Sequence, residues 1–188
     1  MPSLPTHLVV GFALGQSPSP RARVGLKFLL IAMACSALPD IDVVGFRFGI
    51  HYGDLWGHRG LTHSLLFALL VGTTVGFLLG GSWGKKISRS ILLCVITASH
   101  GVLDAMTNGG LGVAFFSPFD TRRFFLPWRP IQVSPIGAGR FVSARGVEIL
   151  LNEMAIVWLP ALLVGMAFFL LRRWHDNSRR VGAQELRD

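Results

Sequence analysis

Charged residues are scarce in this chain. Lys, Arg, Asp and Glu together make up 15% of its 188 residues, whereas an ordinary soluble domain has about 25%. Hydrophobic residues make up 51%, so the chain has the apolar surface that disordered segments lack, and disorder is excluded. A mean hydropathy of +0.53 and long apolar runs favour a small polytopic membrane protein instead. The length fits a single domain.

Acidic residues are rarer still. Only 10 Asp and Glu stand against 18 Lys and Arg, which gives a net charge of +8. Such a surplus can indicate a nucleic-acid-binding protein. Here the basic residues lie between apolar runs and not along one exposed face, so we expect no nucleic-acid partner. Their spacing suits membrane topology better.

Cysteine occurs only twice, as Cys35 and Cys94, and both lie inside apolar runs. A cysteine in that position acts as a small buried hydrophobic residue, so neither indicates a redox compartment. The first 16 residues lack the charged start and the small-residue cleavage pattern of a secretory signal. We therefore expect them to remain on the mature protein.

Four apolar runs approach or reach the length of about 20 residues that a membrane-spanning helix needs. They cover residues 24–44, 61–81, 87–106 and 147–171. A shorter run, residues 6–15, predicts an N-terminal membrane helix. The chain is therefore expected to be an all-α, polytopic transmembrane helical bundle with four strong spans and a short N-terminal membrane helix. We expect one integral-membrane domain, residues 1–175, followed by a charged cytoplasmic tail, residues 176–188.

The basic residues predict an orientation. Lys and Arg are more frequent on the side that holds residues 16–23, residues 82–89 and the tail than on the side that holds residues 45–60 and 107–146. The positive-inside rule places the first side in the cytoplasm. The second side would face the periplasm.

Histidine and aspartate gather at one end of the predicted spans. PDID (39–42) closes the first strong span, HRGLTHS (58–64) opens the next, and HGVLD (100–104) lies near the end of the third. Antiparallel crossings bring these three motifs to one membrane face, and His7 joins them if the short N-terminal helix also crosses. Ionisable groups at membrane depth are costly and usually mark function.

The spacing within these motifs suits metal binding. His100 and Asp104 are four residues apart, so on a helix they stack one turn apart and can hold one ion. His58 and His63 are five apart, which fits a loop residue and a helix-entry residue. Imidazole and carboxylate ligands without cysteine suit zinc, manganese or iron. Proton relays and ion pathways use the same groups, so that alternative stays open.

The two carboxylates of PDID have different expected roles. Pro39 removes a helix hydrogen-bond donor, so we expect the chain to unwind there. One of Asp40 and Asp42 could then ligate an ion, while the other bridges a second ion or orients a histidine.

Residues 108–146 are rich in Gly, Pro, Phe and Arg. Aromatic and arginine mixtures prefer the membrane interface. The segment is therefore either an interfacial loop or a loop that admits substrate or contacts its phosphate. The candidate phosphate-binding residues are Arg122, Arg123 and Arg129.

Glu153 lies early in the last apolar run, close to Glu148 and Asn152. Glu148 and Asn152 share a helix face, whereas Glu153 is turned about 100° from Asn152. Two interpretations stay open: the carboxylates pair with an arginine such as Arg145 near the interface, or Glu153 serves as a metal ligand or general base.

THLVVG (6–11), PDID, HRGLTHS and HGVLDAMTNG (100–109) resemble the signature of the YdjM-like family of bacterial inner-membrane metal-dependent hydrolases, also described as LexA-regulated. That family is distantly similar to the helical, zinc-dependent phospholipase C and single-strand nuclease superfamily. The resemblance implies a set of metal ligands, with Asp42 as a ligand or as the partner of one. The others are His7, Asp40, His58, His63, His100 and Asp104.

The sequence thus predicts a membrane-embedded metal-dependent hydrolase that cleaves a phosphoester in a lipid or lipid-linked substrate. We expect a divalent transition metal, zinc before manganese or iron, as two ions, with Asp42 and Glu153 as catalytic candidates. The alternative is a metal-ion transporter or metal-handling protein that uses the same ligands. A transporter would be expected to carry ionisable groups through the bundle and internal repeats, and the sequence has neither pattern.

Overall fold

The computed structural model describes residues 1–17, 25–135 and 143–185, with side chains up to residue 178. Residues 18–24 and 136–142, which belong to the predicted inner and outer loops, and the last three residues of the predicted tail lie outside the described part. The described elements are helices: α1 (Leu4–Gly15), α2 (Leu26–Ala37), η2 (Leu38–Phe48), η3 (Leu61–His63), α3 (Leu65–Leu78), α4 (Trp83–Ala105), α6 (Ala144–Glu153), η4 (Met154–Trp158) and α7 (Leu159–Glu185).

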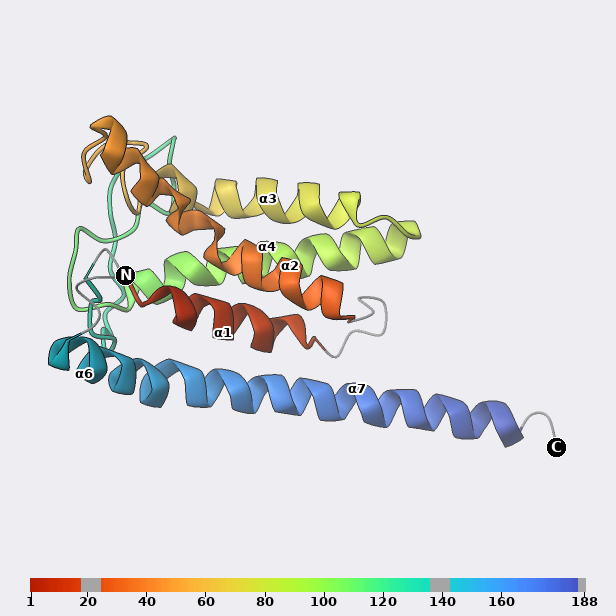
Figure 1. Ribbon diagram of the computed structural model, residues 1–188. Helices are drawn as coiled ribbons and strands as arrows, with labels where there is room; N and C mark the ends of the chain where they lie inside the picture. The colour runs from red at the N-terminus through yellow and green to blue at the C-terminus, as the bar shows by residue number, and fades with distance from the viewer. Residues whose placement is uncertain (18–24, 136–142, 186–188) are drawn as a thin grey trace.

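The long helices lie side by side and run antiparallel along the chain (Figure 1). Helix α3 packs on α4, α1 packs on both α2 and α7, and α2 packs on α4. The start of α1, the end of α4, η2 and α6 lie at one end of this bundle, the left end in Figure 1. The chain segments that carry the His and Asp motifs therefore meet there.

Glycine allows the close packing of α3 against α4. A Cβ atom at Gly72 would lie 2.3 Å from the backbone nitrogen of Cys94, and one at Gly76 would lie 2.5 Å from that of Ser90. Small residues four apart are a common means of bringing membrane helices together, because apolar association gives no net gain in lipid. This pair packs the second half of α3 closely against the first half of α4.

One apolar core cluster lies between α2 and α4, and a second, around Val10, Ile131 and Val157, joins α1 to η4 and to the loop after α4. In the first cluster, Phe28 and Ala32 pack against Leu93 and Ile96. Most apolar side chains of α7 face outward, since only 11% of the most hydrophobic stretch of the continuous helix Ala144–Ser178 is buried inside the protein. Exposed apolar surface on this scale marks contact with a membrane or a protein, and for this long apolar helix lipid is the natural surrounding.

Within the described part of the chain, three helices are long and apolar enough to cross a membrane: Leu26–Phe48, Trp83–Ala105 and Ala144–Ser178. The predicted four strong spans are not confirmed, because the run 61–81 yields the shorter helix Leu65–Leu78, and Leu4–Gly15 is short as well. The first residues of that run fold separately as η3, and Ser64 then caps α3 by accepting a hydrogen bond from the Phe67 N–H. No β-strand occurs in the described ranges, and two isolated bridges, Thr107–Ile131 and Val113–Phe124, order the loop after α4.

Candidate metal centre

Six of the predicted ligands form two groups at the motif end of the bundle. His7 of α1 lies with His100 and Asp104 of α4, and Asp40 of η2 lies with His58 and His63. Within each group the ligand atoms lie within 4.8 Å of one another. All six side chains are buried. The structure thus brings together residues that are up to 97 positions apart in the printed sequence.

The α2–η2 junction places both aspartates of PDID. Helix α2 ends at Ala37, and the chain continues as a 3₁₀ helix with Pro39 near its start. The expected unwinding after Pro39 is therefore wrong, because the chain tightens into a 3₁₀ helix instead. With three residues per turn, residues two apart are separated by about 120° instead of about 160° in an α-helix. Asp40 and Asp42 can therefore both turn inward, and both are buried.

Four imidazole rings form a continuous series through the two groups. His7 stacks on His100 with ring centroids 3.6 Å apart, the centroid of His100 lies 4.6 Å from that of His63, and His63 lies 5.2 Å from His58. The Nε2 atoms of His63 and His100 are only 3.0 Å apart. Two nitrogens at that distance can share one proton or one cation, so the two groups adjoin each other.

Hydrogen bonds on the far side of the rings fix which nitrogen faces the centre. The Nδ1 atom of His100 donates to the carbonyl oxygen of Ser36 at 2.7 Å, and Nδ1 of His58 donates to Oδ1 of Asp42 at 2.8 Å. Since carbonyl and carboxylate oxygens only accept, these Nδ1 atoms carry protons. Their Nε2 atoms are left with the lone pairs that a metal requires.

Asp42 lies behind the histidines. Besides His58, its carboxylate contacts Nδ1 of His63 at 3.1 Å and accepts a hydrogen bond from the Thr62 hydroxyl at 2.7 Å. It therefore touches the nitrogens that point away from the centre. Of the two roles left open for this residue, the geometry favours the one that orients histidine ligands.

Most of the buried side-chain atoms without a hydrogen-bond partner, among the described residues, belong to this centre. They are both nitrogens of His7, Nε2 of His58 and both carboxylate oxygens of Asp40 and Asp104. Buried polar atoms in proteins are nearly always paired. Unpaired imidazole and carboxylate atoms that converge on one place fit a site for divalent cations.

The charge of the centre leads to the same conclusion. Among the described side chains of the centre, the carboxylates of Asp40, Asp42 and Asp104 face one guanidinium, that of Arg59. A buried charge without a compensating charge is very costly. Burial lowers the pKa of His63, but the carboxylates of Asp104, Asp40 and Asp42 raise that pKa well above its usual range. Cations bound by the neutral imidazoles would take the place of such a proton.

Arg59 is a residue of this centre that the sequence analysis missed. It is fully buried, and its Nε lies 2.8 Å from Oδ2 of Asp104. Its other nitrogens donate to the carbonyl oxygen of Gly109 at 2.9 Å and to the hydroxyl of Thr107 at 3.0 Å. Its backbone adopts a φ of 64°, which is uncommon for a residue other than glycine. The signal for Arg59 in the sequence is its position inside HRGLTHS. The topology prediction uses it only as one of the basic residues in the range 45–60.

Glu153 lies outside both ligand groups. Its carboxylate accepts hydrogen bonds from the backbone N–H of Ser3 at 2.7 Å and from the hydroxyls of Ser3 and Thr6. Trp158, in the π-helical turn that follows, donates to the same Thr6 hydroxyl. These bonds attach the start of the last helical segment to α1, which carries His7. A role of Glu153 as general base stays a prediction. Its neighbour Glu148 pairs with Arg145 at 3.6 Å.

Arg123 supports the loop that carries His58. Its guanidinium donates to the carbonyl oxygens of His58 at 2.9 Å, Tyr52 at 3.1 Å and Asp54 at 3.2 Å. These contacts hold the segment between η2 and η3 against the loop that follows α4. Three of the hydrogen bonds that this guanidinium can donate are therefore directed to backbone.

Arg122 and Arg129 have more open surroundings. Arg122 is exposed and forms a close ion pair with Asp120 at 2.6 Å. The Arg129 guanidinium lies over the ring of Phe125, 4.8 Å from its centroid. Contact of the three predicted arginines with a substrate phosphate stays a prediction.

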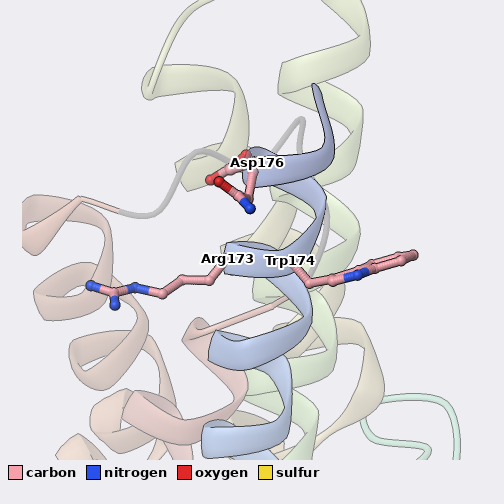
Figure 2. Close-up of a pocket in the computed structure, with 4 residues that line it drawn as sticks. Arg173, Trp174 and Asp176 are labelled. Atoms are coloured by element: carbon pink, nitrogen blue, oxygen red, sulfur yellow. The ribbon is translucent and has the colours of Figure 1, made fainter. Parts of the chain in front are cut away.

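A hollow of about 570 Å³ lies at the opposite end of the molecule, beside the end of α7. Arg173 and Trp174 line it, but in Figure 2 their side chains point in opposite directions and Asp176 points elsewhere again. Arg173 lies over the ring of Phe169. Because the polar groups do not converge, this hollow offers no comparable site.

Comparisons with known proteins agree with the motifs. Residues 1–177 match the family described as YdjM inner membrane protein. The chain is 37% identical to inner membrane protein YbcI of Escherichia coli (strain K12) over 179 residues, which cover 92% of this chain and 100% of that protein. No solved structure matches. The chain therefore belongs to the YdjM inner membrane protein family.

Proposed function

We propose that this inner membrane protein is a metal-dependent hydrolase that cleaves a phosphoester bond in a lipid or lipid-linked substrate. The observation that supports this most is the pair of adjoining buried groups, His7–His100–Asp104 and Asp40–His58–His63, with their unpaired ligand atoms. Two divalent ions held by these six residues would supply an activated water and would stabilise negative charge on phosphoester oxygens. The donor set suits zinc first, with manganese or iron as alternatives.

The residues around the ligands have supporting roles in this proposal. Asp42 holds the Nδ1 proton of His58 and so presents its Nε2 to the centre. Arg59 compensates the charge of one oxygen of Asp104, which leaves the other oxygen for an ion. Asp42 also remains a catalytic candidate in this proposal, acting through the orientation of His58 and His63.

A lipid substrate fits the surroundings of the centre. The loop after α4 lies at the same end of the bundle (Figure 1), and its Phe119 and Trp128 side chains are 86% and 65% exposed. Exposed aromatic residues beside arginines are typical of the membrane interface. Arg122 and Arg129 lie in the same loop, where they could contact a headgroup phosphate.

Hydrolysis should be measurable without a membrane gradient. In detergent micelles, the purified protein should release product from at least one member of a panel of phosphoester lipids. Chelation should abolish the activity and added zinc should restore it, because the six proposed ligands would hold the ions that hydrolysis requires. The control variant His51→Ala should keep the activity and its response to chelation. The His51 side chain is 89% exposed and lies outside both ligand groups.

The rival function predicts the opposite result. A metal transporter should take up metal into proteoliposomes and hydrolyse no lipid. The cluster of Phe28, Leu93 and Ile96 between α2 and α4 is apolar, so it offers an ion no ligands along that contact. Metal uptake without hydrolysis across a broad lipid panel would nevertheless replace the hydrolase proposal by the transporter.

We also propose that the metal centre faces the periplasm. The support is the excess of Lys and Arg toward the other end of the bundle. In a variant without Cys35 and Cys94, an impermeant thiol reagent applied to intact cells should label Asp54→Cys and should not label Ser178→Cys. Both positions are exposed, so accessibility is matched. Labelling of Ser178→Cys alone would show the opposite orientation, with the metal centre on the cytoplasmic side.

A further inference from the structure

An apolar groove of about 380 Å³ lies beside the metal centre. It runs between the start of α1 and the α2–η2 junction. Its lining includes Leu4, Ala34, Leu38, Ile41, Val43 and Asp40. A volume of this size lies within the range of small-molecule binding sites.

The groove faces the lipid side of the protein. Its lining residues 34–43 belong to the segment Leu26–Phe48, one of the three helices long and apolar enough to span a membrane. The side chains of Leu4 and Ile41 are 48% and 57% exposed. In a membrane, the molecules that meet such a surface are the hydrocarbon chains of lipids.

Asp40 connects this groove to the metal centre. It is the one charged side chain among the described lining residues, it is 8% exposed, and both of its carboxylate oxygens are buried without a hydrogen-bond partner. Its Oδ1 lies 3.3 Å from Nε2 of His100 and 3.6 Å from Nε2 of His63. The apolar surface therefore ends at a ligand that belongs to the centre.

We infer that this groove binds one hydrocarbon chain of a membrane lipid and brings the headgroup of that lipid to the Asp40 side of the metal centre. The inference rests on the proposed function and narrows its substrate to an amphiphile with a long chain. It also places that chain on α1 and η2 instead of on the aromatic loop after α4. A water-soluble phosphoester with the same headgroup lacks the part that the groove recognises.

Filling the groove should therefore affect long-chain substrates only. Ala34 is an exposed lining residue of α2, so Ala34→Trp can place a ring in the groove without disturbing the core. We expect its KM for a long-chain phosphoester lipid to rise about tenfold, the factor that corresponds to about two methylene groups losing their burial. Its KM for a short-chain analogue with the same headgroup should stay within about twofold.

Ala167→Trp is the matched control. Ala167 is exposed on α7, so this variant adds the same ring to an apolar surface away from the groove and should leave both KM values unchanged. Equal effects of Ala34→Trp on both substrates, or no effect on either, would overturn the groove as the chain-binding site. Metal content should be unchanged in both variants, since neither residue is a ligand.

A second readout does not depend on catalysis. A phospholipid with a diazirine on its acyl chain, in vesicles that contain the full chain, should cross-link to Leu4, Leu38 or Ile41, and Ala34→Trp should reduce that yield about tenfold. If cross-linking succeeds while no substrate is hydrolysed, the groove stands and the proposed function fails. Cross-links spread over α7 with none in the groove would overturn the inference. Unchanged cross-linking with an altered oligomeric state in Ala34→Trp would assign the groove to a second copy.

Discussion

Replacing His63 by alanine should remove most of the metal that copurifies with this protein. His63 lies between the two ligand groups: its Nε2 is 3.0 Å from Nε2 of His100, 3.6 Å from Oδ1 of Asp40 and 3.5 Å from Oδ2 of Asp104. Its loss therefore affects both ions. Because removing only a neighbour of a ligand costs about 10- to 100-fold in affinity, we expect a loss of more than about 100-fold here. Metal analysis and titration of the purified protein measure it.

Two variants make this prediction specific. Asp42→Asn should weaken metal binding by about 10- to 100-fold, less than His63→Ala, because Asp42 contacts the outward nitrogens of His58 and His63. His175→Ala should change nothing, since His175 is exposed on α7 beside Trp174. A normal metal content in His63→Ala would contradict the site. Equal losses in Asp42→Asn and His63→Ala would instead make Asp42 a direct ligand.

The convergence of the motifs at one end of the bundle follows from the sequence by simple geometry. Helices that cross a membrane alternate in direction, so motifs at the end of one span and at the start of the next come to the same side. The short helix α1 also runs away from that end, which brings His7 to His100 (Figure 1). The positions of the apolar runs and of their ends therefore predict which motifs meet.

The number of long helices was harder to predict, because the chain uses apolar residues near the centre for purposes other than spanning. The apolar run 61–81 predicts one span, yet Leu61–His63 forms η3 and α3 begins only at Leu65. Local hydropathy does not distinguish one membrane-spanning helix from a short turn that carries a site residue and is followed by a shorter helix. The hydrogen bond from the Leu65 N–H to the Phe115 carbonyl shows that the turn is fixed by the distant loop.

The division of roles between Asp40 and Asp42 could not be derived from their spacing. It depends on the 3₁₀ geometry of η2, which turns both residues inward, and on the partners that each finds. Asp42 meets His58 and Thr62, whereas the oxygens of Asp40 have no hydrogen-bond partner. Both sets of neighbours come from segments distant in sequence. The role of Arg59 depends on distant partners in the same way, since they lie in the last turn of α4 and just after that helix.

Replacing Arg59 by methionine should cost about 3–5 kcal/mol of unfolding free energy, the amount typical of removing one partner from a buried ion pair. The Arg59–Asp104 pair is fully buried with 2.8 Å between Nε and Oδ2, so the variant leaves the Asp104 carboxylate without compensation. Arg59→Lys should recover only part of this, because a lysine cannot also reach the acceptors on Gly109 and Thr107 as a planar fork does.

The measurement is denaturant unfolding of the metal-free protein in mixed micelles. Arg145→Met is the matched control: Arg145 pairs with Glu148 at 3.6 Å with both side chains more than 60% exposed, and such surface pairs contribute about 1 kcal/mol or less. The double variant Arg59→Met with Asp104→Asn should be more stable than the sum of the two single losses predicts, because it leaves neither charge buried alone. A loss in Arg59→Met no larger than that in Arg145→Met would mean that Arg59 does not stabilise Asp104, and the charge balance of the centre would then have to come from elsewhere.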